Sequence, residues 1–165
     1  MMGKHARKFF LVVAILFTVL LVGFVTARVY KSVSFYVDCS SHINKATYAN
    51  DVETAKNELI KAIDYIEKKN LTEGNTSLFF KNTRNDIGIL YGTLKSVHKE
   101  LESFPENATQ LEKSNFLIGI REILLKVRIP NGISIYPNND FYAFWFLVSI
   151  LGTVLYYKIY YDETH

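Results

Sequence analysis

The run FFLVVAILFTVLLVGFVTA (residues 9–27) decides the architecture of this chain of 165 residues. It contains 19 consecutive positions without a charged side chain. A helix of that length rises about 28 Å, which is close to the ~30 Å hydrocarbon core of a bilayer. We therefore predict a transmembrane helix over residues 9–27.

A cleaved signal peptide is the competing interpretation of this run. The start is basic (residues 4–8), and VTA (residues 25–27) resembles a small-residue cleavage site. However, the apolar cores of signal peptides are about 7–15 residues long, and this run is longer, which favours an uncleaved anchor. A lipoprotein is disfavoured too, because Cys39 follows YVD (residues 36–38) instead of small apolar residues.

A second apolar run lies near the end of the sequence. It is uncharged from Phe141 to Tyr157, and Lys158 can extend its ammonium group to the membrane interface so that the crossing continues to Tyr161. Aromatic residues gather at both ends, as they do at membrane interfaces. We predict a transmembrane helix over 141–161. Its expected interfacial anchors are Trp145, Tyr156, Tyr157 and Lys158.

Two crossings place both termini on the same side of the membrane. The basic residues that flank the outer ends are Lys4, Arg7, Lys8 and Lys158. Only Arg28 and Lys31 lie close on the loop side, so the positive-inside rule places the termini in the cytoplasm of a plasma or inner membrane. We then expect short cytoplasmic tails (1–8 and 162–165) and an exoplasmic domain (28–140).

Apolar residues at three- and four-residue steps predict helices over about 51–69, 86–104 and 109–128 of the exoplasmic domain. Asn50 with Glu53, and Thr109 with Glu112, have the spacing of helix-capping boxes. The expected fold is an all-α membrane protein, in which two transmembrane helices flank an exoplasmic three- to four-helix bundle.

The segment 28–49 allows two interpretations. Its apolar residues could continue the first membrane helix outward as a fourth helix of the bundle. In VSFYV (residues 33–37) they also alternate as in a strand, and so do Ile133 and Ile135, which would allow a short extended ribbon near the membrane. We prefer the helix.

The loop NLTEGNTSLFFKNTRN (residues 70–85) interrupts the helical pattern. Long loops inside compact domains are uncommon and are often functional. Its apolar residues Leu78, Phe79 and Phe80 are therefore our candidate partner-binding loop. A plain connector held in place by its phenylalanines remains the simpler interpretation.

No motif predicts a catalytic, metal or cofactor site. No two of the four histidines (residues 5, 42, 98 and 165) stand at i,i+3 or i,i+4 spacing, and a single cysteine cannot form an internal disulfide. SVHK (residues 96–99) has the Ser-x-x-Lys spacing of penicillin-recognising enzymes, but their SDN and KTG tripeptides do not occur. We expect no cofactor and no metal.

Both membrane segments carry small residues at helical spacing. These predicted packing residues are Ala14 and Thr18 in the first span, and Ser149, Gly152 and Thr153 in the second. Neither interior contains an acidic residue, a basic residue or a histidine, so the two spans do not form a pump or transporter by themselves. The exoplasmic domain contains glycosylation sequons at Asn70, Asn75 and Asn107.

Residues 28–140 carry 15 basic and 14 acidic side chains without a block of like charge, so nucleic acid is not an expected partner. We expect membrane lipid and either a protein partner or a second copy. The favoured function is a non-catalytic, membrane-anchored interaction protein or accessory subunit of a membrane assembly. A two-span sensor input module that acts through a separate signalling partner is the alternative. An enzyme whose site forms only in three dimensions is a lesser one, with His42, Glu73, His98 and Glu100 as conceivable members.

Overall fold

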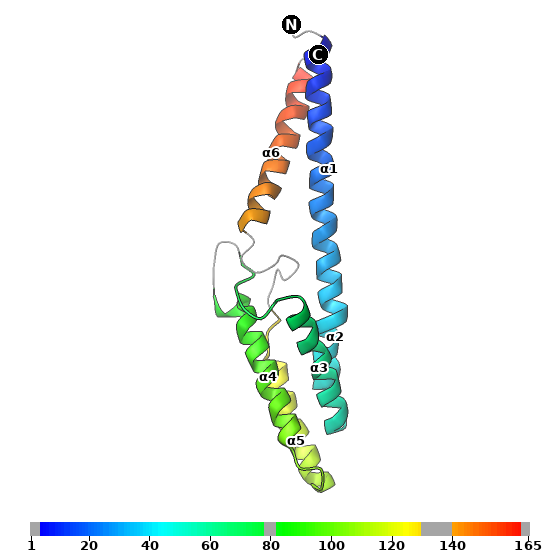
Figure 1. The fold of residues 1–165 in the computed structure, drawn as a ribbon, viewed down its shortest axis with the longest axis vertical. Coiled ribbons are helices and arrows are strands. Elements are labelled where there is room, and N and C mark those ends of the chain that lie inside the picture. Colours follow the sequence, from blue (N-terminus) through cyan, green and yellow to red (C-terminus); the bar gives the residue numbers. More distant parts are fainter. Residues whose placement is uncertain (1–3, 78–81, 130–139, 163–165) are drawn as a thin grey trace. The chain divides into compact units, whose positions relative to one another are not determined.

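The computed structural model describes residues 4–77, 82–129 and 140–162, and its regular structure is helical (Figure 1). The elements are α1 (Lys4–Phe35), the π-helix η1 (Tyr36–Ser40), α2 (Ser41–Thr47), α3 (Val52–Lys68), the 3₁₀-helix η2 (Thr83–Asn85), α4 (Ile87–Ser103), α5 (Gln110–Lys126) and α6 (Asp140–Asp162). These described segments contain no β-strand, only an isolated antiparallel bridge between Asn75 and Asp86. The chain divides into a two-helix unit (1–30 with 139–165) and a helical unit (31–138).

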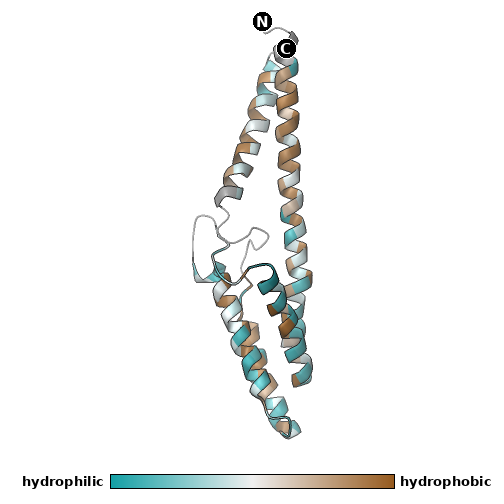
Figure 2. Ribbon diagram, viewed as in Figure 1, coloured by the Kyte–Doolittle hydropathy of each residue, from teal (hydrophilic) through white to brown (hydrophobic). Residues whose placement is uncertain are grey.

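The two-helix unit pairs the first part of α1 with α6. Aromatic side chains join the helices: Phe17 stacks on Tyr156 with ring centroids 5.7 Å apart, and Phe24 meets Tyr142 edge-on at 5.4 Å. Apolar residues dominate both helices (Figure 2). Both are long and apolar enough to cross a membrane.

The large aliphatic side chains of this unit point outward, away from the helix pair. Leu16 and Val19 of α1 are 58% and 63% exposed, and Leu151 of α6 is 60% exposed, whereas Ala14 and Ser149 are fully buried. Helices that pack together in lipid are expected to place small residues at their contact, where close packing depends on them, and large apolar residues on the outer surface of the pair.

In the helical unit, α2 packs against α3, α3 against α4, and α5 against both α2 and α4. One apolar core joins these helices, and its fully buried side chains include Cys39, Leu59, Ile66, Ile87, Leu94 and Val97. The helices form where the sequence places apolar residues at three- and four-residue steps, because that spacing puts them on one face.

The segment 28–49, which the sequence leaves open between helix and strand, is helical as far as Thr47. The chain continues from α1 through the wide turn of η1 into α2, and this turn buries Cys39 and Ser40. The other half of the proposed ribbon, Ile133 and Ile135, lies outside the described residues.

Capping side chains set the starts of the helices. The Thr109–Glu112 capping box is confirmed, since Thr109 Oγ1 accepts from Glu112 N and Glu112 Oε2 accepts from Thr109 N. The predicted cap of α3 at Asn50 is wrong by one residue. Asp51 has the extended backbone of a cap, and its carboxylate accepts from Thr54 N at 2.7 Å, so α3 begins one position later.

Candidate functional site

The predicted membrane packing residues lie in or beside the contact between α1 and α6. Ala14 and Ser149 are 0% and 1% exposed, and Gly152 lies directly against the ring of Phe17, where an added Cβ would come within 2.6 Å of a ring carbon. The hydroxyls of Thr18 and Thr153 each donate to a carbonyl one turn earlier on their own helix, both at 2.8 Å. They need no partner from the other helix.

The four predicted interfacial anchors occupy different environments. Trp145, Tyr157 and Lys158 are exposed on α6. Tyr156 instead packs into the helix pair, where its ring contacts both Phe10 and Phe17. Its side chain therefore contributes to the contact between the two helices.

The candidate partner-binding residues Leu78, Phe79 and Phe80 lie outside the described residues. The chain on either side of them is held together by backbone hydrogen bonds. Thr76 N donates to Asn85 O at 2.8 Å, and Ile87 N donates to Gly74 O at 2.9 Å. This pairing fixes η2 and the start of α4 beside the chain that leaves α3.

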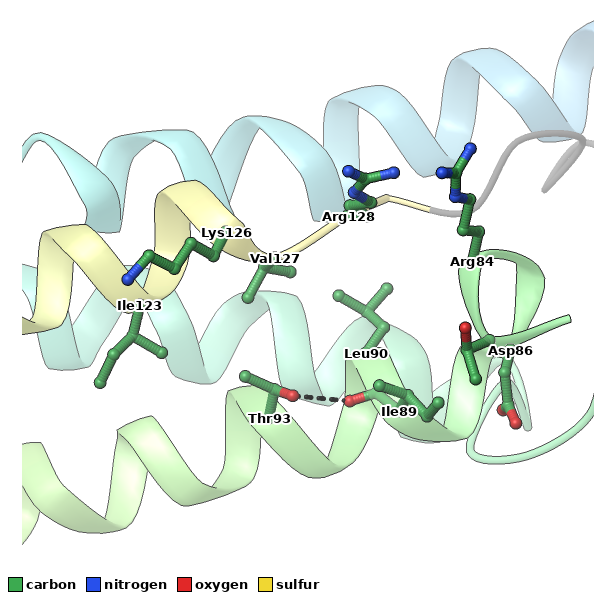
Figure 3. A pocket seen from close by; sticks show the side chains of 10 residues that line it. Arg84, Asp86, Ile89, Leu90, Thr93, Ile123, Lys126, Val127 and Arg128 are labelled. Carbon is green, nitrogen blue, oxygen red and sulfur yellow. Dashed lines mark hydrogen bonds between the residues drawn. The ribbon is translucent and has the colours of Figure 1, made fainter.

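A cavity of about 530 Å³ opens between the start of α4 and the end of α5 (Figure 3). Its apolar wall consists of Ile89 and Leu90 from α4 and Ile123 and Val127 from α5 or just after it. The polar lining consists of Thr83, Arg84, Asp86, Thr93, Lys126 and Arg128. Basic side chains thus surround an apolar wall.

The charge of this cavity is positive. Arg84, Lys126 and Arg128 contribute three cations, and within the described segments no carboxylate forms an ion pair with any of them. The single acidic residue, Asp86, caps α4 by accepting from Gly88 N at 2.8 Å, and its carboxylate points away from the arginines in Figure 3. The cations are exposed at the rim, where an anion can reach them.

Other polar groups of the helical unit join one helix to another. Glu58 of α3 accepts from Lys61 Nζ at 2.6 Å and lies 2.6 Å from Nδ1 of His42 in α2. Glu67 of α3 accepts from the Tyr91 hydroxyl at 2.6 Å and from Lys95 Nζ at 3.1 Å, both on α4. These contacts connect α2 and α4 to α3.

The residues considered for an enzyme are distributed over separate elements. His42 pairs with Glu58, while His98 lies 3.7 Å from Glu102, its neighbour one turn along α4. Glu73 and Glu100 are exposed. Among the described residues, no three potential metal ligands gather into a group.

The thiol of Cys39 is buried in the core of the helical unit. The side chain is 0% exposed, and Sγ lies 3.9 Å from the carbonyl oxygen of Ala62. Burial, reinforced by the nearby charge of Asp38, raises the pKa of Cys39 to about 12. The thiolate needed for disulfide formation is therefore scarce at neutral pH.

A feature that the sequence analysis missed lies on the outer side of α5. This helix buries Ile120 and Leu124, yet Leu111, Ile118 and Leu125 are 71%, 53% and 58% exposed. The three exposed residues repeat every seven positions and form a second apolar face, which we call the α5 outer stripe. The seven-residue spacing is visible in the sequence, but only the packing of α5 shows which apolar side chains are left outside.

Comparisons with protein-family models, with curated proteins and with solved structures found no match to this chain.

Proposed function

We propose that this protein is a non-catalytic, membrane-anchored assembly protein that pairs with a second copy of itself through the α5 outer stripe. The observation that carries the proposal is the two-sided character of α5. One face completes the core through Ile120 and Leu124, while the stripe leaves Leu111, Ile118 and Leu125 more than half exposed. Exposed large apolar side chains that line up along one side of a helix are typical of a protein–protein contact.

The spacing of the stripe favours another helix as the occupant. A seven-residue repeat keeps apolar side chains on one side of a helix that packs along a second helix. Leu111 and Leu125 stand seven residues on either side of Ile118. A two-fold axis through Ile118 therefore places Leu111 of one copy opposite Leu125 of the other, which makes the stripe complementary to itself in the antiparallel direction.

Charges beside the stripe favour the same arrangement. Glu112, Gly119 and Lys126 repeat at the same spacing, one position after the stripe residues. The two-fold axis through Ile118 places Glu112 of each copy two positions, or about 3 Å of helix rise, from Lys126 of the other, which is within reach of these long side chains. Gly119 lies one position from the axis, where nothing stands within 4 Å of an added Cβ and a second helix can approach closely. Opposite charges at these positions stabilise the antiparallel pair and set its register.

The membrane anchoring in this proposal rests on α1 and α6. Both are long and apolar enough to span a bilayer, and their exposed aliphatic side chains would be costly to leave in water. In the proposed topology both termini are cytoplasmic and the helical unit is exoplasmic. Confinement to a membrane also raises the effective concentration of the stripes, so a modest helix–helix contact suffices for pairing.

Sedimentation equilibrium of the full chain in density-matched maltoside micelles tests the pairing. We expect a reversible dimer whose dissociation constant rises at least tenfold in Ile118→Glu, because two carboxylates would then meet on the two-fold axis. The matched control is Ile60→Glu, which changes an exposed isoleucine of α3 away from the stripe and should leave the constant within twofold.

A charge exchange tests the direction of pairing. Lys126→Glu alone should weaken the dimer, because the new carboxylate faces Glu112 of the other copy. The double variant Lys126→Glu with Glu112→Lys should recover most of the loss. A wild-type chain that stays monomeric, or a double variant weaker than both single variants, would contradict the proposal.

A second candidate function, a sensor input unit, is favoured by the basic cavity between α4 and α5, which has the size of a small-molecule site. Such a unit would need a separate signalling partner. The basic and apolar side chains that line the cavity indicate the chemistry of its ligand.

A further inference from the structure

We propose that the cavity between α4 and α5 binds an anionic amphiphile, a phosphate or carboxylate head group attached to a hydrocarbon chain. The head group binds between Arg84 and Arg128, and the chain lies against Ile89, Leu90, Ile123 and Val127. This site is separate from the α5 outer stripe and does not depend on self-pairing.

The head-group position follows from two arginines, Arg84 and Arg128, which extend in the same direction at one end of the cavity, whereas Lys126 points toward the other end (Figure 3). Arg84 comes from η2 and Arg128 from the chain just after α5, so the fold brings them to one cavity from distant parts of the sequence. No ion pair among the described residues neutralises them. Like charges that converge without a counter-charge are relieved by an anion, and guanidinium groups suit phosphate and carboxylate oxygens in particular.

The chain position follows from apolar surface that the core does not use. Ile89 and Ile123 are 50% and 37% exposed, although Leu90 beside them is 3% exposed. The Thr93 hydroxyl on the same wall already donates to Ile89 O at 2.8 Å, as the dashed line in Figure 3 shows. The wall therefore offers mainly apolar contact, which a hydrocarbon chain can cover.

A second cavity in the same unit differs from the first in the charges that line it. It has a volume of about 420 Å³, and its charged lining contains Asp51, Glu53, Glu102 and Glu106 as well as Lys56 and Lys113. Its charges are mixed, and Lys56 is paired with Glu53 at 2.7 Å. The α4–α5 cavity has the opposite character, with three unpaired cations and one carboxylate that caps a helix.

Isothermal titration calorimetry of the full chain in maltoside micelles with hexyl phosphate tests the site, with empty micelles as the blank. We expect saturable binding, and at least tenfold weaker binding of inorganic phosphate and of hexanol, because each lacks half of the recognised chemistry. The double variant Arg84→Gln with Arg128→Gln should weaken hexyl phosphate binding at least tenfold. Lys99→Gln removes an exposed cation of α4 outside the cavity and should change binding less than twofold.

A second arm separates a soluble ligand from a membrane lipid. The full chain is reconstituted in nanodiscs of neutral lipid with a trace of spin-labelled phosphatidate, and lipid immobilisation is measured by electron paramagnetic resonance. If the wild-type chain immobilises the spin-labelled phosphatidate and the arginine double variant does not, the head group belongs to a membrane lipid. If the wild-type chain binds hexyl phosphate but does not immobilise phosphatidate, the head group belongs to a soluble amphiphile.

The proposal is overturned if the arginine double variant binds hexyl phosphate as wild type does and retains phosphatidate equally. It is also overturned if the wild-type chain does neither. Arg84 and Arg128 lie outside the α5 outer stripe, so their substitution leaves self-pairing intact and the two proposals fail or stand separately.

Discussion

At the scale of single residues, the clearest electrostatic contact of the helical unit is the carboxylate of Glu58. It accepts a hydrogen bond from Lys61 and lies against His42, and the Glu58 side chain is only 14% exposed. The Lys61 hydrogen bond and, second, the His42 contact lower the pKa of Glu58. The pKa values of Asp51, Glu67 and Glu112 are lowered in the same direction, because their carboxylates accept hydrogen bonds from Thr54, from Tyr91 and Lys95, and from Thr109, respectively.

These shifts predict that the helical unit loses stability in acid. A carboxyl group whose pKa is lower in the folded chain stabilises the fold above the ordinary pKa of about 4.3, and this contribution is lost as pH falls through the folded value. We expect the free energy of unfolding, measured by urea titration in maltoside micelles, to fall between pH 6 and pH 3. Glu58→Gln should show a shallower fall, while Glu100→Gln, at an exposed position of α4, should keep the wild-type slope. An unchanged pH dependence of the unfolding free energy in Glu58→Gln would show that Glu58 does not contribute to the loss of stability in acid.

At the scale of elements, the apolar periodicity of α3, α4 and α5 and the capping box of α5 could be read from the sequence, because both depend on residues close together in the chain. The wide turn of η1 could not, since nothing in YVDCS (residues 36–40) marks it and its buried residues pack on α3. The α4–α5 cavity was missed for a related reason. Arg84 and Arg128 are distant in the sequence and meet only through the packing of the helices.

The helices α1 and α6 pack closely at the small residue Gly152. An added Cβ on Gly152 would lie 2.6 Å from a Phe17 ring carbon, so a larger side chain must push the helices apart. We expect Gly152→Leu to destabilise the helix pair by about 1–3 kcal/mol, the usual cost of overpacking. Gly23→Leu is the matched control, because nothing lies within 4 Å of its added Cβ.

The loss is measured as the mole fraction of SDS that abolishes near-ultraviolet circular dichroism in mixed maltoside micelles. This signal reports aromatic packing such as Phe17 on Tyr156. Equal midpoints for the Gly152 and Gly23 variants would show that α1 and α6 do not pack closely at Gly152.

At the scale of the whole molecule, the proposed topology places the helical unit on the exoplasmic side. The sequons at Asn70, Asn75 and Asn107 all lie in that unit, so they report its side directly. Translation in the presence of endoplasmic-reticulum microsomes should yield a membrane-bound chain that carries glycans removable by endoglycosidase. Substitution of all three asparagines by glutamine should abolish the mass shift. Unmodified chains with protease-accessible helical units would place this unit in the cytoplasm and reverse the topology.

Assembly is the property of the whole molecule on which the proposed function depends. Two copies paired antiparallel bring the Ile118 side chains together but hold Leu111 far from its own counterpart. The step of fourteen positions from Leu111 to Leu125 spans about 21 Å of helix. A disulfide requires Cα atoms within roughly 7 Å of each other, so the pairing direction determines which single cysteines can cross-link.

Oxidative cross-linking of cysteine variants in intact membranes is the most direct test of this account. The wild-type chain is the blank, because its thiol, Cys39, is buried. Ile118→Cys should form a disulfide-linked dimer, and Leu111→Cys and Leu125→Cys should cross-link with each other when co-expressed but not when expressed alone. Absence of cross-linking at all three positions, or dimers from Leu111→Cys and Leu125→Cys expressed alone, would contradict antiparallel pairing through α5.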